Sequence, residues 1–151
     1  FKRQRTFMKR IANLALILFS ISASAQEDFA KYKWRNRIVV LSTQDLTSEK
    51  FISHWERLKS SPKKLDDRNI LLFALAKGRI YDKDLKALSG FHVSPLRKRY
   101  DIPTRFEGFT LIGKDGGVKM QKNIPFDVAA IFETIDNMPM RQREMRENLD
   151  D

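Results

Sequence analysis

The feature that most constrains the fold is a pair of unbroken apolar runs separated by a stretch with helical spacing. The runs are Ile38 to Leu41 and Ile70 to Ala76. A run of β-branched and apolar residues without polar alternation is typical of a strand buried on both faces of a sheet. The stretch between them carries apolar residues at helical spacing, namely Phe51, Ile52, Trp55 and Leu58. We therefore expect a βαβ unit with two parallel strands.

The second half of the chain predicts a hairpin and a closing helix. Apolar residues 109–112 form one strand, residues 113–117 contain three glycines suited to a tight turn, and residues 118–120 return as the second strand. Asp127 then opens a helix whose apolar residues lie on one face, and Pro139 ends it.

The stretch from Gly78 to Arg105 has the least definite pattern. Residues 62–67 predict a turn, residues 82–88 a short helix stopped by Gly90, and Ser94 with Pro95 the start of another helix. The resulting order is β-α-β-α-β-β-α, an α/β sandwich with a mixed sheet of four or five strands and helices on both faces. This is the order of a thioredoxin-like core, although other small α/β sandwiches share it.

Residues 1–25 predict an N-terminal extension and a cleavable signal peptide. Lys9 and Arg10 precede an apolar run from Ile11 to Ile21, and Ala23 and Ala25 follow at the −3 and −1 positions. We expect Met8 to be the start, cleavage before Gln26, and a periplasmic or secreted protein with no stable membrane span. The alternative is an uncleaved anchor, but the run is shorter than the roughly 20 residues that span a bilayer.

The remaining chain divides into a domain at residues 26–139 and a charged tail at residues 140–151. The tail alternates Arg with Glu and predicts a solvated helix in which exposed Met140 and Met145 would be free to contact a partner.

Charge and cysteine content exclude two classes of function. Five of the 29 basic residues lie in residues 1–25, which leaves 24 basic against 19 acidic residues in the domain and tail. That modest excess, together with export, argues against nucleic-acid binding. The chain contains no cysteine, so it has no thiolate nucleophile, redox pair or thiolate metal ligand.

Three segments carry a family resemblance. The lead-in Lys33-Trp34-Arg35-Asn36-Arg37, residues 108–119 with the sequence GFTLIGKDGGVK, and residues 138–145 with the sequence MPMRQREM resemble domain of unknown function family 4174. That family is similar in fold to thioredoxins and peroxiredoxins, and it also occurs in vertebrate secreted matrix proteins with sushi repeats. The resemblance implies a thioredoxin-like fold and an extracytoplasmic setting, and it implies no established reaction.

In thioredoxins and peroxiredoxins the catalytic thiol follows the first strand, at a position that corresponds here to residues 42–48. This stretch offers only hydroxyl, amide and carboxylate groups, so the departure removes thiol redox chemistry. Ser42, Thr43 and Thr47 are candidate ligand-binding residues beside the amides of the first helix, and Thr47 is the expected N-cap. Asp45 and His54 are the candidate catalytic residues. Turn and capping chemistry explains the loop residues equally, and packing explains the histidine.

Basic residues supply a second candidate site. A patch that binds an anionic glycan, sulfate or phosphate is predicted from six residues: Arg35, Arg37, Arg97, Lys98, Arg99 and Arg105. Solvated strand ends and helix faces produce similar runs. With two histidines and no clustered acids, the sequence predicts neither a metal site nor a cofactor.

Two functional hypotheses follow. The first is an exported, non-catalytic thioredoxin-like module without thiol redox activity that binds a protein or an anionic glycan. The alternative is a non-thiol enzyme, a hydrolase or a peroxide-handling protein, that uses the loop after the first strand. Which partner is bound, and whether the protein forms oligomers, is left open by the sequence.

Overall fold

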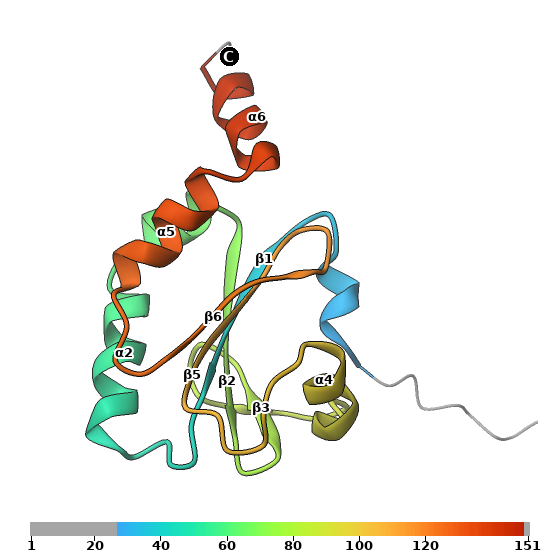
Figure 1. Ribbon diagram of the computed structural model, residues 1–151, viewed down its shortest axis with the longest axis vertical. Coiled ribbons are helices and arrows are strands. Elements are labelled where there is room, and N and C mark those ends of the chain that lie inside the picture. The colour runs from blue at the N-terminus through green and yellow to red at the C-terminus, as the bar shows by residue number, and fades with distance from the viewer. Residues whose placement is uncertain (1–26, 150–151) are drawn as a thin grey trace, which may run out of the picture.

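Two apolar strands form the centre of the sheet in the computed structural model, which describes residues 27–149 (Figure 1). Strand β1 (Arg37–Ser42) is buried at all six positions. It pairs in parallel with β2 (Ile70–Ala76) and antiparallel with β5 (Gly108–Ile112). The predicted βαβ unit is therefore confirmed, because helix α2 (Glu49–Lys59) connects the two parallel strands.

Three further strands complete a six-stranded sheet with the order β4-β3-β2-β1-β5-β6. The hairpin partner of β5 is β6 (Val118–Asn123), as predicted. The two additional strands are β3 (Arg79–Tyr81) and β4 (Ala87–Leu88), which raise the count above the four or five expected.

The predicted helix at residues 82–88 is wrong. The Asp82 carboxylate accepts hydrogen bonds from the backbone N–H groups of Asp84 (2.9 Å) and Lys86 (3.0 Å), which closes a turn. The chain then returns as β4 alongside β3.

Alternating side chains of the central strands build one apolar layer on each face of the sheet. One layer packs under α2, α3 (Pro62–Asp67) and α5 (Val128–Asp136). The opposite layer packs under the short 3-10 helix η1 (Phe29–Tyr32) and α4 (Val93–Arg99). Figure 1 shows α2 and α5 on one side of the sheet and α4 on the other. Helices on both faces were expected.

Three helix boundaries differ from expectation. Residues 62–67 form helix α3 and not a turn, with Pro62 at its start. The N-cap of α2 is Ser48 and not Thr47, because the Ser48 hydroxyl accepts from the N–H of Phe51 (3.3 Å). Helix α5 already ends at Asp136, and Pro139 opens helix α6 (Pro139–Glu147).

The close pairing of β5 with β6 generates a test of the fold at Gly108. A Cβ atom at this position would lie 2.1 Å from the carbonyl oxygen of Lys122. We expect Gly108→Ala to lower the free energy of unfolding by at least about 2 kcal/mol, because the hairpin must shift to relieve the overlap. Urea denaturation measures the change.

The matched control is Gly117→Ala in the turn of the same hairpin. Its added Cβ would meet the Asp115 carboxylate oxygen at 3.5 Å, an ordinary contact. Its unfolding free energy should change by less than about 0.5 kcal/mol. Equal stability of the two variants would contradict the strand register described here.

Candidate functional site

The loop between β1 and α2 is held by its own hydrogen bonds. The Thr43 hydroxyl donates to the Asp45 carbonyl (3.0 Å) and accepts from the Asp45 N–H (3.1 Å). The Asp45 carboxylate in turn accepts from both the N–H (2.9 Å) and the hydroxyl (2.8 Å) of Thr47. These bonds, first of all the one from the Thr47 N–H, hold the pKa of Asp45 below its usual range. The polar groups of the loop are thus engaged in turn and capping geometry.

Ser42 and Thr43 differ in exposure from the rest of the loop. Both are buried, Ser42 at the end of β1 and Thr43 just after it, whereas Asp45 and Thr47 are exposed. The Ser42 hydroxyl finds no hydrogen-bond partner among residues 27–149. The structure therefore separates the predicted loop residues into two that face the core and two that face solvent.

His54 is packed into the core layer under α2 and does not face the loop. Its Nδ1 lies 2.7 Å from the carbonyl oxygen of Lys50, and its Nε2 accepts the backbone N–H of Phe126 (3.3 Å). The ring also packs on the Phe126 ring, with 4.6 Å between centroids. The first bond requires a hydrogen on Nδ1 and the second requires a free lone pair on Nε2. Both ring nitrogens are therefore committed, and His54 fastens the segment before α5 to α2.

The predicted basic patch is divided among separate places. Arg37 lies at the start of β1 and Arg105 lies in the loop before β5, at the opposite end of the sheet. Arg35 donates to the Lys31 carbonyl (2.7 Å), and Arg99 forms an ion pair with Asp28. Arg97 donates to the carbonyl of Pro103, and Lys98 is exposed on α4. Arg37 therefore lies apart from Arg105, and Arg35, Arg97 and Arg99 are each engaged by a group of the chain itself.

An ion cluster at the start of β1 holds helix α6 to the domain. Glu144 accepts hydrogen bonds from Arg37 (3.1 and 3.3 Å) and pairs with Lys114 (2.7 Å). Arg141, whose side chain is 4% exposed, pairs with Asp67 and Asp136. The expectation of a solvated helix was wrong for these two residues of α6. Met140 and Met145 are likewise partly buried and not exposed.

Electrostatics in the cluster favour the charged form of its acids. Burial alone would raise the pKa of Glu144, but hydrogen bonds from Arg37 and Lys114 outweigh it and hold the pKa below its ordinary value of 4.5. The same balance, with Arg68 and Arg141 as donors, lowers the pKa of Asp136. The cluster is a structural clamp, since each of its cations is already paired with an acid.

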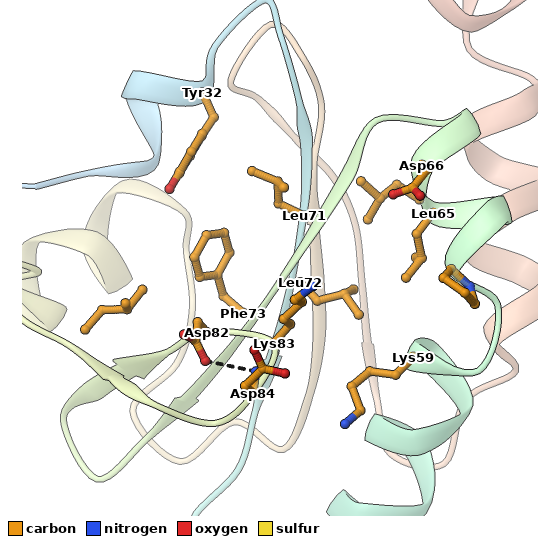
Figure 2. A pocket seen from close by; sticks show the side chains of 13 residues that line it. Tyr32, Lys59, Leu65, Asp66, Leu71, Leu72, Phe73, Asp82, Lys83 and Asp84 are labelled. Carbon is orange, nitrogen blue, oxygen red and sulfur yellow. Dashed lines mark hydrogen bonds between the residues drawn. The ribbon is translucent and has the colours of Figure 1, made fainter.

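A groove of about 630 Å³ runs beside the first half of β2 (Figure 2). The groove is bounded by η1, α3 and the turn between β3 and β4, and its lining is mostly apolar. Its lining consists of Tyr32, Lys59, Pro62, Leu65, Asp66, Leu88, residues 70–73 of β2, and Asp82, Lys83 and Asp84 at one end. Sequence reasoning missed this groove because it depends on where β3 stops. The sequence feature that could have indicated the groove is the purely apolar run of β2, residues 70–76.

Within residues 27–149, no group of three or more His, Cys, Asp or Glu side chains has an arrangement that would hold a metal ion. In the same part of the chain, every helix is too short or too polar to cross a bilayer. The segment that predicts the signal peptide lies outside the described residues.

Comparisons with known proteins agree on the fold. A family model described as "Domain of unknown function (DUF4174)" matches residues 28–144. Coiled-coil domain-containing protein 80 of Danio rerio is 23% identical over 138 residues, which is 81% of this chain and 16% of that protein. Among solved structures, the reduced 2-Cys peroxiredoxin of Plasmodium vivax superposes with a TM-score of 0.55 at 16% identity, covering 76% of this chain and 83% of that one. The chain thus has a thioredoxin- and peroxiredoxin-like fold, as the sequence predicted.

The ion cluster predicts how stability depends on pH. Because the pKa of Glu144 is lowered in the folded state, the unfolded chain binds more protons in the window below 4.5. The unfolding free energy should therefore fall as the pH drops from about 5 to about 3. Glu144→Gln should flatten this dependence and lower stability at pH 7 by about 2 kcal/mol, because buried Arg37 loses its counter-charge.

Glu147→Gln on the exposed side of the same helix is the matched control. It removes the same charge without touching Arg37, so its curve of stability against pH should follow that of the unaltered protein. Urea midpoints measured at several pH values check this. An equal flattening by both variants would show that Glu144 is not the coupled group.

Proposed function

The chain belongs to the DUF4174 family, and we propose that it is an exported, thioredoxin-like binding module that holds a protein partner and performs no thiol chemistry. Membership in the family establishes the fold but does not identify a reaction. The function has to be argued from the groups present at the two candidate sites.

The observation that carries the proposal is the composition of the loop after β1. In thioredoxins and peroxiredoxins this is the position of the catalytic thiol, and the similar structure from P. vivax is titled as a 2-Cys enzyme. The present chain has no cysteine. In place of a thiol it has Thr43, Asp45 and Thr47, which hydrogen-bond to one another. These groups support a turn and not a nucleophile.

A non-thiol enzyme would need a base beside this loop. Activation of a hydroxyl requires an adjacent acceptor that takes its proton. His54 is committed to Lys50 and Phe126. The Asp45 carboxylate accepts the Thr47 hydroxyl, but the pKa of Asp45 is held below its usual range, which makes this carboxylate a weak base. The geometry gives no support to the hydrolase or peroxide-handling alternative.

A protein partner is favoured over an anionic glycan by the distribution of charge and apolar surface. The arginines that would bind an anion are dispersed, and Arg37 is buried in an ion pair. The groove beside β2 is instead mostly apolar, with charged groups of both signs at its margin, which suits a polypeptide better than a sulfated sugar. Support for export comes from residues 9–25 alone.

The absence of thiol chemistry is tested with the purified chain. Consumption of hydrogen peroxide in the presence of dithiothreitol should equal that of a heat-denatured sample, because the chain has no cysteine that peroxide could oxidise and the dithiol could reduce again. Dithiol-dependent turnover that remains after removal of contaminants would overturn the proposal.

The binding half of the proposal is tested by capture. Tagged chain, immobilised and equilibrated with periplasmic or surface extract, should retain a protein at saturable occupancy. Retention no greater than on an unrelated thioredoxin-fold control would count against a binding role.

A further inference from the structure

Strand β3 is shorter than its neighbour and leaves half of β2 without a partner. The register pairs Ala74 with Tyr81 and Ala76 with Arg79, and the chain turns away at Asp82. Residues 70–73 therefore have a strand only on the β1 side. The open edge of these residues faces the groove beside β2.

The direction of the backbone groups follows from the bonds to β1. The N–H of Arg37 donates to the Asn69 carbonyl (2.9 Å), and the N–H of Thr43 donates to the Leu75 carbonyl (3.0 Å). Because backbone direction alternates along a strand, odd-numbered residues of β2 face β1 and even-numbered residues face away. Ile70 and Leu72 thus point their N–H and C=O groups into the groove. Within residues 27–149, no loop or turn backbone group is bonded to these four groups.

The groove has a different wall on each side of this edge, as Figure 2 shows. Tyr32, Leu71 and Phe73 lie on one side of β2, and Leu65 lies on the other with α3. The turn after β3 closes one end, where the carboxylates of Asp82 and Asp84 are found.

We propose that this groove binds an extended peptide segment of a partner protein, which adds a strand to the free edge of β2. The proposal deepens the binding role proposed above and rests on it. Another extended chain also presents an N–H and a C=O group at every second residue. It can therefore pair with the free N–H and C=O groups of β2. Peptide residues opposite Ile70 and Leu72 direct apolar side chains toward Leu65. The residue between them directs an apolar side chain toward Tyr32 and Phe73.

Besides the backbone edge and the apolar walls, charge at the closed end of the groove contributes to specificity. Asp84 is exposed, and none of the hydrogen bonds and ion pairs described above uses its carboxylate. A Lys or Arg in the peptide gains an ion pair only in direct contact with Asp84, because Lys59 and Lys83 also line the groove. The ligand class is thus an extended segment with alternating apolar residues followed or preceded by a basic residue.

A second copy of this chain is a poorer occupant than a separate peptide. The edge of β2 lies between the walls formed by η1 and α3. Two identical edges recessed in this way cannot approach to hydrogen-bonding distance, whereas a narrow extended chain can enter.

The test begins with selection of displayed random decapeptides on the full chain. Enriched peptides should carry the alternating apolar pattern with a terminal Lys or Arg, and their affinity is measured by fluorescence anisotropy. Synthetic versions with one N-methylated amide at a time should lose about tenfold in affinity at two amides spaced two residues apart and little at the amide between them, since each of those two donates to the C=O of Ile70 or Leu72.

Two groove variants and a control locate the binding. Leu71→Asp places a charge on the apolar wall, and Asp84→Lys reverses the charge at the closed end. Each should weaken binding about tenfold or more. Glu133→Lys makes the same charge change on the exposed side of α5 and should leave the affinity within about twofold. Urea midpoints of all three confirm folding.

The outcomes separate this inference from the wider function. Peptides that bind the groove variants as tightly as the unaltered chain, or that lack the two-residue period on N-methylation, would overturn the groove assignment while leaving a binding role standing. Self-association that Leu71→Asp abolishes would identify a second copy as the occupant and overturn the proposal. If neither peptides nor extract proteins bind, the binding function itself fails.

Discussion

The burial of β1 on both faces and both edges is the constraint on which the rest of the structure depends. All six of its residues are buried, and β2 and β5 satisfy its backbone on either side. Most polar groups at its two ends find partners close by, and within the described part of the chain the exceptions are the Ser42 hydroxyl and Nε of Arg37. At the start, Arg37 recruits Glu144 from a helix 107 positions away along the chain. At the end, Thr43 and Asp45 satisfy each other. The same strand thus fixes the clamp on α6 and the closed loop where related folds carry chemistry.

That division explains how a fold associated with redox enzymes can persist without its thiol. The fold is stabilised by the two apolar layers, and of the loop residues Leu46 alone is among the side chains that pack against them. The loop in turn needs only hydrogen bonds that Thr, Asp and Ser supply as readily as any catalytic sequence. The fold of this chain therefore does not depend on a thiol in this loop.

The sequence predicted the elements whose signal is local and missed those that depend on distant contacts. Continuous apolar runs identified β1 and β2, and glycines 113, 116 and 117 identified the hairpin turn. Strand β3 has only three residues, too few to show a period, and β4 pairs with it only because the turn at Asp82 brings it back. The role of Arg37 could not be predicted as structural, since its partner Glu144 is close in space and not in sequence. Likewise, the sequence allowed His54 as a base or as a packed residue, and only the bonds of its two nitrogens to Lys50 and Phe126 distinguish the two roles.

The free edge of β6 and the free edge of residues 70–73 of β2 are protected against strand addition by different means. This difference bears on the groove. Strand β6 carries Lys119 and Lys122 on an exposed edge, the usual way to prevent strand addition. Residues 70–73 of β2 carry no charge and are protected only by the walls around them. The turn that ends β3 places Leu85 at a φ of 57°, a conformation unfavourable for leucine, and packing of its side chain against the core offsets that cost. Because β3 stops short and the unpaired half of β2 carries no charge, β2 retains an edge that another extended segment can complete.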